Sequence, residues 1–250
     1  MSIRSRVSIG IVVGAVLTII FVATLPSRAA APAYTSETVV HAGTIAGVIT
    51  YAGNPPAPAR VDISKDLDVC GISPQFDQSL VVGKSGGVAD VVVALTDIRR
   101  GAPLVPARGI EFDQIGCEYR PRVLAFPAGS TVDIVNSDGI LHNVHTQSTI
   151  NPPINVAQPG FKRVIEVTVA YPELISVSCD VHNWMQGWWY VAGNPYYAIT
   201  AADGRYEIKN VPPGTYTLKV WQERLGTTDK KVTVTPDATI TADFALGPIK

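Results

Sequence analysis

Short runs in which apolar and polar residues alternate occupy most of the chain after residue 42. Alternation puts every second side chain on the same face of an extended strand, and the runs are separated by turn residues such as those at 202–204 and 212–214. No long amphipathic helix interrupts them. This pattern predicts an all-β protein built from sandwiches or barrels. The residues that share a face are Ile45, Gly47, Ile49 and Tyr51; Val132 and Ile134; Ile175, Val177 and Cys179; Tyr216, Leu218 and Val220; and Ile240, Ala242, Phe244 and Leu246.

The first 28 residues follow a different pattern. Arg4 and Arg6 precede an uncharged run of apolar and small residues from Val7 to Leu25. About 20 such residues span a bilayer as a helix, and basic residues stay on the cytoplasmic side. We therefore expect residues 1–28 to form one N-terminal transmembrane helix that anchors the rest on the periplasmic, exported side. The alternative is a signal segment cleaved near 29–31, which would release a soluble periplasmic protein.

Composition narrows the range of functions. The 250 residues include 20 Lys and Arg against 21 Asp and Glu, so the net charge is −1 and nucleic acid is not an expected partner. Four histidines are too few for an enzyme with several histidine-rich metal centres. The chain has no Gly-x-Ser-x-Gly motif and no recognisable pair of catalytic carboxylates. We therefore do not expect an enzyme.

One constellation carries metal chemistry. Cys179, His182 and Met185 form a Cys-x2-His-x2-Met motif directly after a predicted strand, and His142 and His145 lie upstream. Two imidazoles, a thiolate and a thioether are the ligand set of a blue copper site that transfers electrons. A short loop after the strand can turn its ligands toward one point, and the second histidine then comes from another strand edge. A lone Cys-x2-His can also be half of a zinc site, although Met is a poor zinc ligand.

Two stretches, 132–144 and 177–185, resemble the cupredoxins, the family of plastocyanin and amicyanin, over roughly residues 80–193. The resemblance implies a Greek-key sandwich with one copper ion that alternates between Cu(I) and Cu(II). It also implies that Asn143, in the His-Asn-Val segment, ties the two ligand loops together by hydrogen bonds. Asn183 departs from the family, in which a proline often follows the loop histidine. The implied copper ligands are His142, Cys179, His182 and Met185.

The three cysteines are consistent with this site. An exported protein with three cysteines is expected to pair two of them and leave one over. With Cys179 as a metal ligand, Cys70 and Cys117 are the expected disulfide.

An aromatic cluster follows the ligand loop. Trp184, Trp188 and Trp189 can pack between two domains, or they can form a docking patch, because aromatic residues are favoured at interfaces. The sequence leaves both interpretations open.

The C-terminal part has a second resemblance, carried by residues 197–200, 203–206 and 211–218. They are similar to the carboxypeptidase regulatory-like β-sandwich, whose usual opening motif matches 43–48 far upstream. A split sandwich would explain this separation. We expect a tether at 29–42, a second small β-sandwich from 43–70 and 194–250, and a cupredoxin-like domain at 71–193.

Three functions fit these features. The first is an exported, membrane-tethered one-electron carrier whose partner is a membrane-bound or periplasmic redox protein or complex. The second is a structural or docking accessory subunit of a respiratory or photosynthetic membrane complex, with copper secondary or absent. A copper-delivery protein is the third, and two methionines in the whole chain argue against it.

Overall fold

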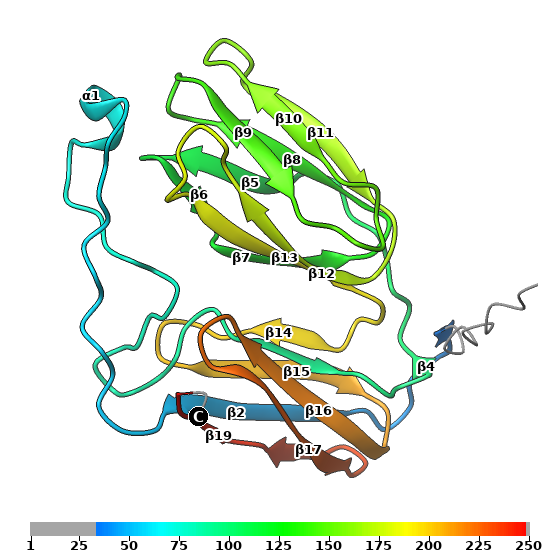
Figure 1. The fold of residues 1–250 in the computed structure, drawn as a ribbon. Coiled ribbons are helices and arrows are strands. Elements are labelled where there is room, and N and C mark those ends of the chain that lie inside the picture. The colour runs from blue at the N-terminus through cyan, green and yellow to red at the C-terminus, as the bar shows by residue number, and fades with distance from the viewer. Residues whose placement is uncertain (1–33, 249–250) are drawn as a thin grey trace, which may run out of the picture. The chain divides into compact units, whose positions relative to one another are not determined.

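Nineteen β-strands and one short helix make up the regular structure of residues 34–248, the part of the chain that the computed structural model describes (Figure 1). The all-β class is confirmed. The helix is α1 (Leu67–Cys70). The strands are β1 (Thr35–Ser36), β2 (Gly43–Tyr51), β3 (Val92–Leu95), β4 (Arg100–Gly101), β5 (Ile110–Ile115), β6 (Glu118–Arg120), β7 (Val123–Pro127), β8 (Ser130–Asn136), β9 (His142–Thr146), β10 (Asn155–Gln158), β11 (Val164–Val169), β12 (Glu173–Ser178), β13 (Gln186–Ala192), β14 (Tyr197–Ile199), β15 (Arg205–Val211), β16 (Gly214–Gln222), β17 (Gly226–Val234), β18 (Thr239–Thr241) and β19 (Phe244–Leu246).

Strands β5 to β13 form two sheets, which we call the first sandwich. One sheet has the order β10-β9-β12-β13-β7 and the other has the order β11-β8-β5-β6. Alternate side chains from both sheets meet in one buried cluster, as the period of two predicts. Its large fully buried members include Phe112, Phe126, Ile134, Ile175 and Trp189.

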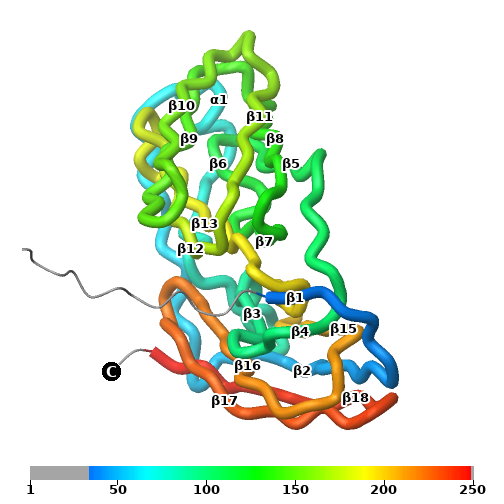
Figure 2. Tube along the Cα trace, turned by 90° about the vertical axis from the view of Figure 1, so that its right-hand side faces the viewer, coloured from blue at the N-terminus to red at the C-terminus, as the bar shows by residue number. Residues whose placement is uncertain are grey.

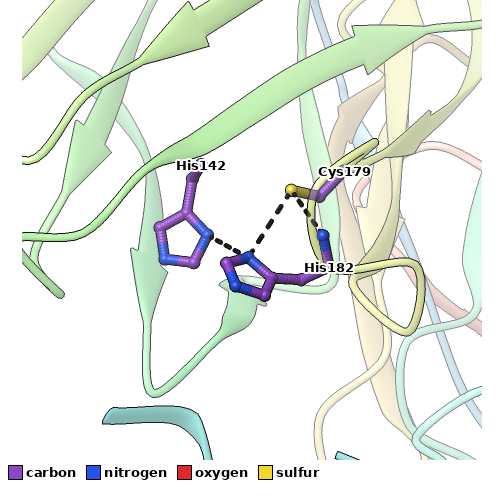
Figure 3. A group of neighbouring side chains, drawn as sticks. All are labelled: His142, Cys179 and His182. Carbon is purple, nitrogen blue, oxygen red and sulfur yellow. Dashed lines mark hydrogen bonds between the residues drawn. The ribbon is translucent and has the colours of Figure 1, made fainter. Parts of the chain in front are cut away.

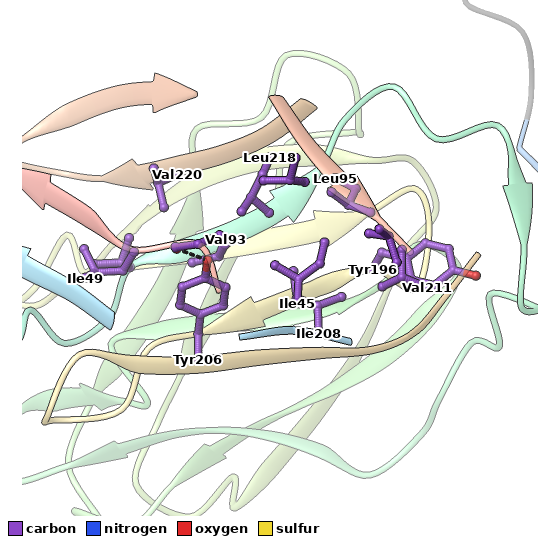
Figure 4. Close-up of a cluster of buried hydrophobic side chains, with 14 of the residues drawn as sticks. Ile45, Ile49, Val93, Leu95, Tyr196, Tyr206, Ile208, Val211, Leu218 and Val220 are labelled. Atoms are coloured by element: carbon purple, nitrogen blue, oxygen red, sulfur yellow. Dashed lines mark hydrogen bonds between the residues drawn. The ribbon is translucent and has the colours of Figure 1, made fainter. Parts of the chain in front are cut away.

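The remaining long strands form the second sandwich, with sheets β14-β3-β16-β17 and β15-β2-β18. Strand β2 pairs with β15 antiparallel and with β18 and β19 parallel, so residues near both ends of the described chain lie side by side. Its core is a separate apolar cluster (Figure 4). Members of this cluster include Ile45, Ile49, Val93, Leu95, Tyr206, Ile208, Leu218 and Val220.

The boundary between the two sandwiches does not lie at residue 71, where we expected it. Strand β3 pairs with β14 and β16, and Val93 and Leu95 are buried in the core of the second sandwich. Cys70, by contrast, packs into the core of the first sandwich. The difference arises because a buried strand such as β3 is apolar on both faces and carries no sign of which sheet it joins.

The expected tether and anchor have different outcomes. Part of the tether, 29–42, is strand: β1 pairs with β4, and the Tyr34 hydroxyl donates a hydrogen bond to Ala102 O at 2.6 Å. The expected transmembrane helix at 1–28 lies outside the described residues. Between residues 34 and 248, no helix is long and apolar enough to cross a membrane.

A long excursion leaves the second sandwich between β2 and β3. We call residues 55–78 the strap; it carries α1 and is the cyan segment in Figure 2. Its two arms run antiparallel, with an isolated bridge between Arg60 and Phe76. The Val61 N–H donates to Gln75 O at 2.9 Å, and this bond helps to hold the arms together.

Gly47 is predicted to be required for the close packing of β2. A Cβ added there would lie 2.5 Å from Ala242 O, the same carbonyl that accepts the Tyr206 hydroxyl. Gly47→Ala should therefore lower the free energy of unfolding by about 1–3 kcal/mol, measured by urea denaturation. Gly247→Ala is the matched control, because its Cβ would meet only Ala52 Cβ, at 3.7 Å. Equal stability of the two variants would contradict this account of the packing.

Candidate metal centre

The loop between β12 and β13 closes on itself through backbone hydrogen bonds. The Cys179 N–H donates to Met185 O at 3.2 Å, and the Met185 N–H donates to His182 O at 2.9 Å. The His182 N–H donates to Cys179 Sγ at 3.4 Å. Because β12 and β13 are neighbouring antiparallel strands, the loop is a tight hairpin connection. This closure keeps Cys179, His182 and Met185 within one short turn.

His142 reaches the loop from the neighbouring strand. It opens β9, which pairs with β12 next to Cys179. His142 Nδ1 lies 3.0 Å from His182 Nδ1, and Cys179 Sγ lies 3.9 Å from His182 Nδ1 (Figure 3). One potential ligand atom from each of the three residues lies within 4.8 Å of the others. Sheet pairing therefore brings together residues that are about forty positions apart in the sequence.

All four predicted ligands are shielded from solvent. His142 and His182 are 0% exposed, Cys179 is 2% exposed and Met185 is 1% exposed. Met185 and Cys179 belong to the apolar core of the first sandwich. The structure thus leaves no ligand side chain open to solvent.

Each histidine bonds a carboxylate with its outer nitrogen. His142 Nε2 lies 2.9 Å from Asp138 Oδ2, and His182 Nε2 lies 2.8 Å from Asp66 Oδ2. A carboxylate accepts, so we assign the Nε2 proton to both rings. The neutral form of each ring then has its lone pair on Nδ1, directed into the group.

This arrangement tests whether the residues fit a metal. Two Nδ1 lone pairs at 3.0 Å beside a buried sulfur repel one another unless a cation lies between them. A proton on His142 or a metal ion meets this requirement. Imidazole, thiolate and thioether donors suit copper, whereas the thioether is poorly suited to zinc. The donor set therefore fits copper.

The electrostatics of the group favour charged forms of His142 and Cys179. Burial lowers the pKa of His142, but its hydrogen bonds with Asp138 and Cys179 outweigh this and raise the pKa to about 9. Burial raises the pKa of Cys179, but hydrogen bonds from His142 and from backbone N–H groups lower it overall. For His182, burial and the charge of His142 lower the pKa despite the hydrogen bond with Asp66. The thiolate is the form that binds metal.

Asn143 connects the two ligand segments, in the role that the cupredoxin resemblance implied. Its Oδ1 accepts the Asp180 N–H at 2.5 Å, and its Nδ2 donates to Asp180 Oδ2 at 3.1 Å and to Asn155 Oδ1 at 2.9 Å. Asp180 is the residue after Cys179. Asn143 therefore fixes the start of the ligand loop to β9.

His145, the alternative upstream histidine, lies outside the group. Its side chain is 31% exposed and its Nδ1 lies 3.0 Å from Asp180 Oδ1.

A second set of neighbouring groups comprises Cys117, Asp138 and His142. Cys117 is bonded to Cys70 in a disulfide, so it offers no thiolate there.

The three tryptophans occupy three different environments. Trp189 is fully buried and packs edge-on against Phe112 and Phe126. The Trp188 indole N–H donates to Glu223 Oε2 at 2.6 Å, so Trp188 contacts the second sandwich. Trp184 packs beside His182, with ring centroids 5.1 Å apart. Burial in a core and packing between sandwiches account for Trp189 and Trp188.

Sequence reasoning missed the two carboxylates. Asp138 was detectable, because it lies four residues before His142 in the predicted ligand segment. Asp66 is 116 residues from His182, and no local pattern links them.

A comparison with protein-family models finds a match in the C-terminal part of the chain. Residues 191–247, which include β14 to β19, match the family model of the carboxypeptidase regulatory-like domain. No curated protein matches the chain.

Solved structures give partial matches. A Cu-containing nitrite reductase from Thermus scotoductus SA-01 is 22% identical at a TM-score of 0.31, over 39% of this chain and 24% of that one. A reduced Cu(I) form of an amicyanin variant is 21% identical at a TM-score of 0.31, over 33% and 81%. A purple cupredoxin from Nitrosopumilus maritimus is 20% identical at a TM-score of 0.29, over 33% and 99%. The chain thus spans about a quarter of the nitrite reductase.

Removing the Asn143 side chain should loosen the ligand loop. Asn143 is 4% exposed, and Asn143→Ala leaves the Asp180 N–H without its acceptor. The substitution removes three hydrogen bonds of a buried amide, each worth about 0.5–1.5 kcal/mol, so we expect the free energy of unfolding to fall by about 1–3 kcal/mol. Asn155→Ala, at the exposed partner, is the control and should cost less. A larger loss in the control than in Asn143→Ala would disprove the assigned role.

Proposed function

We propose that this protein is an exported, membrane-tethered one-electron carrier with a type 1 copper site formed by His142, Cys179, His182 and Met185. The observation that carries the proposal is the convergence of two Nδ1 atoms and one Sγ, with both outer nitrogens bonded to carboxylates. A first sandwich of the cupredoxin type, as the sequence resemblance implies, is part of the proposal. Copper bound there would supply a centre that changes between Cu(I) and Cu(II).

The residues of the site favour electron transfer over catalysis. A catalytic metal site keeps one position open to water or substrate, whereas all four side chains of the proposed ligand set are buried from solvent. The closed loop and the carboxylates hold the ligands in one arrangement. A fixed arrangement suits both oxidation states, because little movement accompanies the change of charge. We therefore propose a carrier rather than an enzyme.

An accessory subunit is the second candidate. The observation that favours it is the second sandwich, which matches a carboxypeptidase regulatory-like domain and contributes no residue to the groups that could hold a metal among the described residues. A carrier needs only the first sandwich, so the second one offers surface for a partner in a membrane redox complex. The copper content of the protein isolated from its native membrane separates the two candidates: a stoichiometric ion supports the carrier.

The ligand assignment can be tested with a matched pair of histidine variants and one cysteine variant. Copper-loaded wild-type protein should show an intense visible band from charge transfer between the Cys179 thiolate and Cu(II). Cys179→Ser and His142→Ala should abolish it, because each removes a ligand atom. His145→Ala should retain it, since His145 lies outside the group. The measurement is a visible absorption spectrum with the copper content of each sample.

Two outcomes would contradict the proposal. A wild-type protein that takes up zinc in preference to copper from an equimolar mixture would support a zinc site instead. A Cys179→Ser protein that keeps the colour would remove Cys179 from the ligand set.

The anchor is a further part of the proposal. The uncharged run from Val7 to Leu25, preceded by Arg4 and Arg6, is long enough to span a bilayer and directs the later residues to the exported side. Tethering would raise the effective concentration of the copper site near a membrane-bound redox partner. Intact-mass measurement of protein from membranes should find residues 1–28 retained. A mature protein lacking about 30 N-terminal residues, recovered in the soluble periplasmic fraction, would refute the anchor.

A further inference from the structure

Asp66 reaches the metal centre from outside the sandwich that supplies the ligands. It lies in the strap, between β2 and β3 of the second sandwich, immediately before α1. Its carboxylate lies 2.8 Å from His182 Nε2. The contact therefore joins two segments that no strand pairing connects.

The backbone of Asp66 is unusual for its position. An aspartate at a helix N-cap normally turns its carboxylate onto the first N–H groups of the helix, but Asp66 makes no such bond. Its φ of 48° lies in the left-handed region, which costs free energy for a residue other than glycine. The Asp66 carboxylate thus does not cap α1. The residue adopts the left-handed conformation, and its carboxylate bonds His182 instead.

Three further contacts attach the strap to the ligand region. Lys65 Nζ donates to Val181 O at 3.1 Å, within the ligand loop. Gln75 Nε2 donates to Gly116 O at 2.6 Å. Cys70, the last residue of α1, forms the disulfide with Cys117 in the turn between β5 and β6. Asp66 is therefore held on its target from both directions along the chain.

The disulfide also connects the supports of the two histidines. The Cys117 N–H donates to Asp138 Oδ2 at 2.8 Å, and that oxygen lies 2.9 Å from His142 Nε2. On the other side of the disulfide, the Cys70 N–H donates to Asp66 O at 2.8 Å. One covalent link thus joins the segment that orients His142 to the segment that orients His182.

We propose that Asp66 is a positioning residue of the metal centre, which the strap supplies and the Cys70–Cys117 disulfide anchors. It fixes the Nε2–H tautomer of His182, so that the Nδ1 lone pair faces the metal, and its negative charge stabilises the higher oxidation state. The proposal rests on the function proposed above. Carboxylate partners of ligating histidines typically contribute 10- to 100-fold to metal affinity, whereas an exposed ion pair contributes little. Asp66 is 45% exposed, but its partner His182 is fully buried, so the hydrogen bond orients a ring that is shielded from solvent.

Two substitutions of Asp66 separate its charge from its hydrogen bond. Asp66→Asn keeps an acceptor and removes the charge, so the reduction potential should rise while the affinity for copper falls less than in Asp66→Ala. Asp66→Ala removes both, and copper affinity in a chelator competition should fall about 10- to 100-fold. Asp68→Asn is the matched control, because Asp68 is an exposed acidic residue of the same helix. It should leave affinity and potential at the wild-type values.

A readout that needs no copper tests the same assignment. Nitrogen-15 NMR of the imidazole rings, at a pH where His182 is neutral, should find the Nε2–H tautomer in the wild type. In a His142→Ala background, which removes the protonated His142 Nδ1 that faces His182 Nδ1, Asp66→Ala should mix the two tautomers. A wild-type protein that binds no copper would overturn the proposed function, and this measurement would still decide whether Asp66 orients His182.

The disulfide has its own test. In a Cys70→Ser, Cys117→Ser background, Asp66→Ala should change affinity and potential less than in the wild type, because the strap is no longer anchored. An undiminished change would overturn the anchoring. Asp66→Ala with wild-type affinity, potential and tautomer would overturn the positioning role altogether.

Discussion

The candidate metal centre depends on one electrostatic constraint: two neutral imidazoles cannot direct their Nδ1 lone pairs at each other across 3.0 Å without a proton or metal ion between them. The constraint exists because Asp138 and Asp66 bind the opposite nitrogens and so decide which atom of each ring is free to act as a donor. If either carboxylate were absent, the ring beside it could exchange tautomers and the repulsion would disappear. The carboxylates thus orient two buried histidines so that both Nδ1 atoms are preorganised as donors.

The sheets supply the positions that make this pairing possible. Strands β9 and β12 are neighbours, His142 begins β9 and Cys179 directly follows β12, and Asn143 joins the two segments by hydrogen bonds. The connection to β13 is short enough that His182 must return toward the same point. This part of the geometry rests on backbone pairing inside an apolar core and on the buried Asn143 side chain.

The sequence was informative wherever the chemistry is local. Cys179, His182 and Met185 lie within seven residues, so their grouping could be predicted before any fold was known, and the alternation along β8 and β12 identified strands with one buried face. Long-range partners were not accessible. Strand β3 is buried on both faces and could belong to either sandwich, and Asp66 has the sequence features of a helix cap. In both cases the deciding contact is more than a hundred residues away, with Tyr197 to Ile199 and with His182.

The two carboxylates that bond the histidines, Asp138 and Asp66, come from different parts of the fold. Asp138 belongs to the first sandwich and contacts His142, whereas Asp66 lies in the segment that connects β2 to β3 of the second sandwich. A strap that only connected β2 to β3 would need few residues, and its ordering costs conformational entropy. The disulfide at Cys70 offsets part of that cost by restricting the unfolded chain. The strap therefore links the second sandwich to His182, the residue that Asp66 contacts.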